Sequence, residues 1–116
     1  MSFDDTYRCT VSVTLDVIGG KWKPLILWLL SFKTLRFSQL QRRLPQITRK
    51  MPTQQLRELE RDSIIHREVY AEVPPRVEYS LTELGQSVVP ILSLMCQWGK
   101  DYQAATAQDS ATEQAV

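Results

Sequence analysis

The sequence predicts a mainly α-helical domain with one small β-hairpin, and three observations predict it. Apolar residues recur at helical spacings of three and four through most of the chain. Two short stretches of this kind are separated only by Pro45-Gln46-Ile47. Two β-rich runs then flank the proline pair Pro74-Pro75, as expected of a hairpin. Paired short helices followed by a hairpin predict a winged helix-turn-helix.

The first two helices are predicted from Cys9 to Ile18 and from Lys21 to Leu30. Gly19-Gly20 stops the first. The second is dense in large apolar residues and should be buried. Pro24 fits its first turn, where a missing N–H costs little.

A short strand is predicted at Leu35–Phe37. A helix then opens near Ser38, with Phe37, Leu40 and Leu44 facing inward. Pro45 closes it, so this is the first helix of the pair.

The second helix of the pair runs from an N-cap at Thr48 to its end at Asp62-Ser63. Pro52 lies near its start, so the helix should begin a residue or two late or be bent there. Its two sides differ in chemistry. The inward side is Pro52, Leu56, Leu59 and Ser63, and the outward side is Lys50, Gln54, Arg57 and Arg61.

The hairpin is predicted from strands Ile64–Glu72 and Val77–Leu81, with Arg76 near its tip. Thr82 should cap a long final helix to about Tyr102, kinked at Pro90. We therefore expect a flexible arm (1–8), one domain (9–103) and a disordered tail (104–116).

Composition limits the class of protein. The 116 residues suit one domain. They hold no apolar run that would span a membrane and no leader-like segment, so a cytoplasmic protein is expected. Two distant cysteines and one histidine make no metal site, and no cofactor motif is present.

Charge is segregated although the formal net charge is only +1. No acidic residue lies between Asp16 and Glu58. That interval holds nine basic residues: Lys21, Lys23, Lys33, Arg36, Arg42, Arg43, Arg49, Lys50 and Arg57. Such segregation predicts a basic face that attracts a polyanion; the alternative is an ordinary solvated surface.

The chain resembles the HxlR-type winged helix-turn-helix transcriptional regulators of bacteria and archaea. The resemblance covers about Cys9 to Tyr102. It is carried by Cys9, IGGKWKPLIL (Ile18–Leu27), RFSQLQRRLPQIT (Arg36–Thr48), QQLRELERDSIIHR (Gln54–Arg67), YAEVPPRVEYSLTELG (Tyr70–Gly85) and Trp98-Gly99. The chain departs from the family pattern at Pro52, where leucine is usual, and at Ser63, where glycine is usual.

The resemblance implies a homodimer that binds palindromic operators in double-stranded DNA. It also implies that some members respond to electrophiles or oxidants through an N-terminal cysteine, whose place Cys9 takes. Cys9 would lie at a helix start, where a thiolate is favoured, although a buried, unreactive thiol is the alternative.

A major groove accepts one α-helix, and its walls are phosphates. We therefore expect the second helix of the pair to read DNA, with the hairpin as the wing. The expected base-reading residues are Arg49, Lys50, Thr53 and Gln54, the phosphate contacts Arg42, Arg43 and Arg57, and the wing contact Arg76.

The final helix has a wider apolar face than a small domain needs. Together with the first helix it predicts a dimer seam, for which we expect Leu15, Leu92, Met95, Trp98 and Tyr102. Packing of this face within its own chain is the alternative.

Two other functions compete with operator binding. A winged helix can serve as a protein-interaction module without sequence-specific DNA binding. An enzyme with Cys9 as nucleophile lacks a base, since His66 is predicted on the distant hairpin, so we expect no enzyme.

Overall fold

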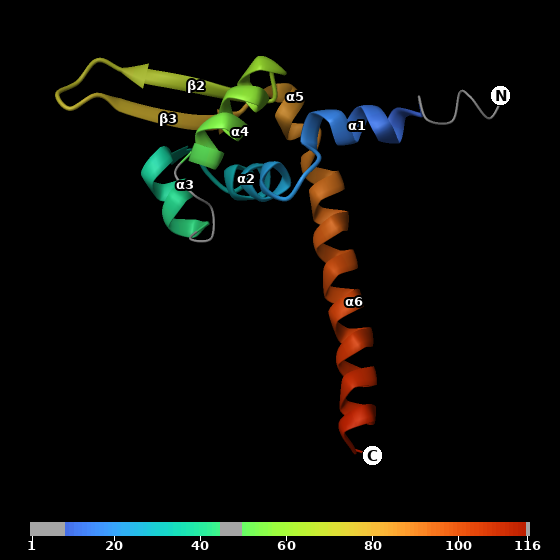
Figure 1. Cartoon of the computed structure of the whole chain (residues 1–116). Coiled ribbons are helices and arrows are strands. Elements are labelled where there is room, and N and C mark those ends of the chain that lie inside the picture. Colours follow the sequence, from blue (N-terminus) through green and yellow to red (C-terminus); the bar gives the residue numbers. More distant parts are fainter. Residues whose placement is uncertain (1–8, 45–49, 116) are drawn as a thin grey trace.

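The computed structural model describes residues 9–44 and 50–115. A mainly helical fold with a small antiparallel sheet is confirmed (Figure 1). In chain order the elements are α1 (Thr10–Ile18), α2 (Trp22–Leu30), β1 (Leu35–Arg36), α3 (Phe37–Arg43), α4 (Lys50–Arg61), β2 (Ile65–Tyr70), β3 (Arg76–Leu81), α5 (Glu83–Gln86) and α6 (Val89–Ala115). The predicted arm, residues 1–8, lies outside the described residues.

The turn between α1 and α2 depends on its two glycines, as predicted. A Cβ at Gly19 would collide with the Leu15 carbonyl oxygen. Gly20 has a φ of 92°, in the left-handed region that other residues rarely adopt. The chain therefore leaves α1 sharply and enters α2 with Pro24 in its first turn.

Helix α4 accommodates its proline at little cost. The described helix begins at Lys50, so Pro52 is its third residue, where a backbone N–H has no intrahelical partner. The Pro52 ring is fully buried. The predicted N-cap, Thr48, lies outside the described residues.

The end of α4 is a left-handed cap built on serine. Ser63 has a φ of 63°. The Ile64 N–H donates to the Leu59 carbonyl at 2.9 Å and the Ser63 N–H to the Glu60 carbonyl at 3.0 Å, which is the Schellman arrangement. The end predicted at Asp62-Ser63 is confirmed.

The sheet has the strand order β1-β3-β2 within the described residues, and all pairs are antiparallel. The β2–β3 register runs from Ile65↔Leu81 to Tyr70↔Arg76. Strand β1 pairs with the other edge of β3 through Leu35↔Tyr79. The hairpin is confirmed, but β2 ends at Tyr70 rather than Glu72.

The core lies between α2, α3, α4 and the sheet, with one residue each from α1 and α6. Its members are apolar residues at the inward positions of these elements. They are Ile18, Ile26, Leu27, Leu30, Leu35, Leu40, Leu44, Leu56, Leu59, Ile64, Ile65 and Leu92.

The C-terminal region differs from the prediction in three ways. Thr82 caps only the short α5, where its Oγ1 accepts from the Gly85 N–H at 3.0 Å. The chain breaks at Ser87-Val88 instead of kinking at Pro90, because Pro90 is the second residue of α6, a position that proline tolerates. Helix α6 also continues to Ala115, so the segment predicted as a disordered tail has helical backbone.

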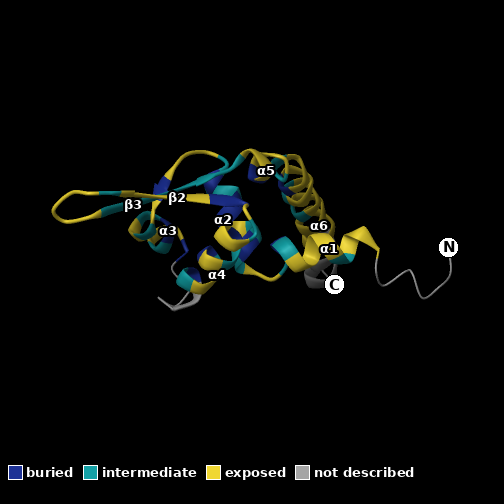
Figure 2. Cartoon of the chain, turned by 90° about the horizontal axis from the view of Figure 1, so that it is seen from above, coloured by how far each residue is buried: buried dark blue, intermediate teal, exposed yellow. Residues whose placement is uncertain are grey.

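Helix α6 projects from the rest of the molecule. Its 27 residues correspond to about 40 Å at 1.5 Å per residue. It extends away from the α2–α4 core, and most of α1 and α6 is exposed (Figures 1 and 2). These two helices lie on one side of the molecule, and α3 and the hairpin on the other, in both views.

Candidate nucleic-acid interface

The two sides of α4 are sorted as the 3.6-residue period predicts, except that Ser63, predicted to face inward, is exposed beyond the end of the helix. Pro52, Leu56 and Leu59 are buried against the core. Gln54 and Arg57 are exposed, as is Arg61. From Gln54 to Arg61 the helix therefore turns a mainly polar and basic side outward.

The first two turns of α4 are described only in part. Thr53 and Gln55 are half-buried next to the exposed Gln54. Lys50 is the first residue of the helix, but its side chain is not described. Arg49, the other predicted base-reading residue, lies outside the described residues.

Helix α3 carries two further cations. Arg42 and Arg43 form its last turn, and both are exposed. The Gln39 side chain accepts a hydrogen bond from the Arg36 N–H at 2.8 Å, which caps the start of the same helix. Among the described residues, no carboxylate pairs with Arg42, Arg43 or Arg57. These cations are thus available to an external anion.

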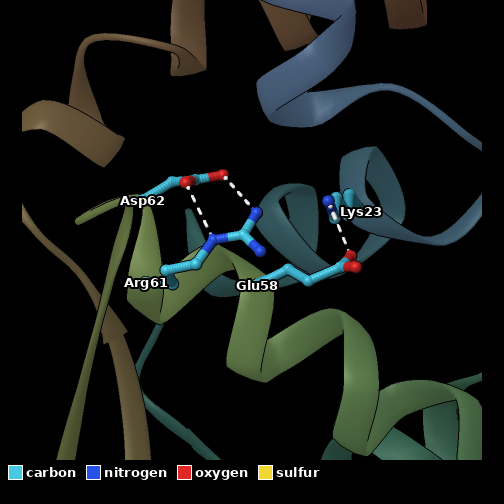
Figure 3. A network of polar contacts seen from close by, with 4 residues as sticks. All are labelled: Lys23, Glu58, Arg61 and Asp62. Carbon is cyan, nitrogen blue, oxygen red and sulfur yellow. Dashed lines mark hydrogen bonds and ion pairs between the residues drawn. The ribbon is translucent and has the colours of Figure 1, made fainter.

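One of the nine basic residues does not belong to a basic face. The Lys23 side chain is buried, and its ammonium lies 2.9 Å from Glu58 Oε2 (Figure 3). The charge of Glu58 is stabilised in turn, because the hydrogen bond from Lys23 and its charge lower the pKa of that carboxyl. The prediction that all nine cations share one surface is therefore wrong at Lys23.

A groove of about 330 Å³ lies between α4 and the sheet. Arg57 of α4 and Arg67 of β2 both line it, together with Thr53 and Tyr79. Arg67 was not among the predicted site residues. Its place beside Arg57 depends on how β2 packs against α4, which the local pattern does not reveal.

The wing residue Arg76 differs from its prediction. It begins β3, and its guanidinium lies over the Tyr70 ring at 4.2 Å to the centroid. Glu72 is 3.4 Å away, and Glu78 approaches Arg76 Nε at 3.3 Å without good hydrogen-bond geometry. The exposed turn consists instead of Val73, Pro74 and Pro75, so Arg76 is not a free cation at the tip.

An apolar face covers α1 and the outer side of α6. We define it by Leu15, Ile91, Met95, Trp98 and Tyr102, which are all exposed. Trp98 and Tyr102 stack at 5.3 Å between ring centroids. A groove of about 380 Å³ runs between α1 and α6 within this face. Four of the predicted seam residues thus lie on an exposed face.

Leu92 does not lie on this face. Only 4% of its surface is exposed, because it packs into the core of its own chain. Its assignment to a dimer seam is therefore wrong.

Cys9 is exposed and precedes the first residue of α1. It therefore lies at the helix start, as predicted. Cys96 is half-buried beside Leu25 and Trp28, and both thiols are free.

Metal-binding clusters and membrane spans were sought within residues 9–44 and 50–115. No group of three potential metal ligands occurs among them. None of the helices found there combines the length and apolarity needed to cross a bilayer.

Comparison with known proteins identifies the family to which the chain belongs. A model of HxlR-like helix-turn-helix proteins matches residues 17–107. A helix-turn-helix-type transcriptional regulator of Methanothermobacter thermautotrophicus is 54% identical over 112 residues, covering 97% of this chain and 84% of the relative.

Two solved structures show similar folds. The redox regulator HypR in its reduced form has a TM-score of 0.81 and 48% identity, over 85% of this chain and 98% of that one. The reduced form of the transcriptional regulator YodB from B. subtilis has a TM-score of 0.70 and 30% identity, over 81% and 93% of the two chains.

Proposed function

The chain belongs to the HxlR-like helix-turn-helix family of transcriptional regulators, and on this premise we propose that it binds palindromic operator DNA as a homodimer. The observation that carries the proposal is the outward side of α4. It offers Gln54 and Arg57 to solvent, and Arg57 has no carboxylate partner among the described residues.

Base reading belongs to the start of α4. We assign it to Arg49, Lys50, Thr53 and Gln54, whose side chains suit the donor and acceptor groups of a major groove. Glutamine pairs with the N6 and N7 atoms of adenine, and arginine or lysine with O6 and N7 of guanine.

Phosphate contacts belong to the cations around α4. Arg42, Arg43 and Arg57 are exposed and unpaired within the described part of the chain, and Arg67 extends the set across the groove. They supply affinity and register but little sequence information. Arg76 contributes less, since Glu72 and Glu78 already compensate its charge.

A homodimer accounts for the apolar face. Exposed patches of large apolar side chains on a small domain mark interaction sites. Helix α6 also projects away from the core, and Ile91, Met95, Trp98 and Tyr102 on its outer side are exposed in the described chain. Two copies joined through α1 and α6 would present two α4 helices to the half-sites of a palindrome.

Cys9 is the proposed sensor of oxidants or electrophiles. It is exposed at the start of α1, one of the two helices of the proposed seam. A thiolate there would add to an electrophile or be oxidised, and the new group would disturb the adjoining seam. HypR, whose fold this chain shares, is a redox regulator.

One experiment tests operator binding and sensing together. DNA bound by the protein is selected from a random pool, with and without diamide. We expect an inverted repeat and a loss of binding on oxidation that Cys9→Ser abolishes. Absence of binding even to random duplex at about 20 mM salt, where phosphate contacts are strongest, would favour a protein-interaction module.

A further inference from the structure

Among the described residues, Lys23 is the charged residue that is buried in the fold. It lies near the start of α2, within a run of apolar residues, and 7% of its surface is exposed. The Glu58 carboxylate on α4 is its ion-pair partner, at 2.9 Å. The contact therefore joins α2 to α4 through two residues that are 35 positions apart in sequence, and Figure 3 shows the pair.

The pair lies behind the DNA-facing side of α4. Glu58 comes between the buried Leu56 and Leu59, with its side chain 29% exposed. Gln54 and Arg57 point outward from the same helix. A change at the pair would therefore move the reading side without touching DNA.

A charge-assisted hydrogen bond restrains α4 differently from its apolar contacts. Leu56 and Leu59 hold the helix on the core, but apolar attraction is non-directional and tolerates small rotations and shifts. A short ammonium–carboxylate bond depends steeply on geometry, and an unpaired ammonium inside the fold is costly. The pair thus favours one position of α4 along and around its axis.

We propose that the Lys23–Glu58 ion pair is a positioning contact that sets the pose in which α4 discriminates between DNA sequences. The inference rests on the proposed DNA reading by α4. Helix α2 also packs against α6, the helix of the proposed seam. The ion pair therefore fixes the position of α4 relative to the seam through α2.

A second ion pair provides the matched control. Arg61 Nε lies 3.3 Å from Asp62 Oδ1, but the two residues are neighbours and the Arg61 side chain is 68% exposed. This pair connects α4 to no other element. Asp62→Asn removes the same charge as Glu58→Gln, at the end of the same helix, without releasing α4 from α2.

The experiment measures a discrimination ratio: the Kd for a scrambled duplex divided by the Kd for the duplex that the wild type selects from a random pool. Glu58→Gln and Lys23→Met should each lower the ratio about tenfold, and the double variant no further, as expected of one coupled contact. Asp62→Asn should stay within about twofold, since its local pair contributes little.

Loss of stability alone must not produce the effect. Ile26→Val shortens a fully buried side chain of α2, lowers the thermal midpoint and leaves the pair intact, so its ratio should not change. Circular dichroism establishes that each variant is folded. If Lys23→Met does not fold, Glu58→Gln alone decides.

A folded Glu58→Gln variant with the wild-type ratio overturns the inference and leaves the proposed function intact. A ratio lowered as much in Ile26→Val or Asp62→Asn overturns it too. A wild type that selects no duplex from the random pool refutes the proposed function, and the inference with it.

Discussion

Gln54 belongs to the proposed reading surface, and its side chain is exposed in the second turn of α4. We expect Gln54→Ala to cost about 1–3 kcal/mol on the selected operator, because a base contact is lost, and to change binding to scrambled DNA little. Fluorescence anisotropy measures both. Gln97→Ala, the same change on α6, is the control. Equal losses on both duplexes would refute a base-reading role.

Arg43 should behave in the opposite way. It ends α3, is exposed and has no carboxylate partner among the described residues, so we assign it a phosphate. Arg43→Ala should weaken binding to all sequences about equally and reduce the slope of log K against log salt by about one. Lys100→Ala on α6 should leave that slope unchanged. A loss confined to the operator would argue against the assignment.

The direction in which a side chain faces could be predicted where helical periodicity decides it. The contacts of a side chain could not be predicted where its partners lie on another element. Gln54 and Arg57 face outward and Leu56 inward, because the 3.6-residue period of the helix sets these directions. Arg76 was predicted as a wing contact, but Tyr70 reaches it across the β2–β3 register and Glu78 from two residues along the same strand. Sequence spacing alone does not give that register.

At the scale of the element, the end of α4 carries measurable strain. Ser63 holds a φ of 63°, which costs an L-residue about 1 kcal/mol and glycine almost nothing. Ser63→Gly should therefore raise the free energy of unfolding in urea by about 1 kcal/mol. Ser87→Gly is the control: φ there is −66°, so glycine should destabilise. Equal effects of the two changes would rule out strain at Ser63.

The α2–α4 contact predicts a pH dependence. Lys23 lowers the pKa of the Glu58 carboxyl in the folded chain, first by hydrogen bonding and then by its charge. The resulting stability is complete above the ordinary value near 4.5 and is lost as pH falls through the lower folded value.

The urea midpoint of Glu58→Gln should therefore lie below that of the wild type at neutral pH. The gap should close as the pH drops below about 4.5. Glu60→Gln, on the same helix and without an ion pair among the described residues, should show little gap at any pH. A gap for Glu58→Gln that persists unchanged into acid would contradict the pairing.

Element-level prediction was limited by long-range packing. The Lys-Trp-Lys-Pro run places a charge inside an apolar helix, which signals a buried pair, but its partner lies on another helix. Pro90 was expected to kink a helix because nothing local shows that the chain breaks at Ser87-Val88. Leu92 and Trp98 share an apolar stripe, yet only the fold shows that one fills the core and the other is exposed.

At the scale of the whole molecule, the projecting α6 predicts self-association. Trp98 is 67% exposed on the apolar face, so Trp98→Lys should place a charge in the proposed seam and shift the protein from dimer to monomer. Sedimentation velocity measures the change. Gln97→Lys introduces the same residue at the preceding position of α6, on its polar side, and this variant should stay dimeric. A monomeric wild type would refute the seam.

The arrangement of the molecule also fixes how it would lie on DNA. The α1–α6 side and the α3–hairpin side are separate in both views, with α4 between them (Figures 1 and 2). A symmetric pair joined through α1 and α6 would leave both α4 helices free. Consecutive major grooves on one face of B-DNA are about 10 bp apart, so the half-sites should have that spacing.

The most direct measurement is methylation of guanine N7, an atom of the major groove, by dimethyl sulfate on the selected duplex with and without protein. We predict two protected tracts, related by symmetry and centred about 10 bp apart. Full methylation of both tracts while the duplex remains bound would show that α4 does not occupy the major groove.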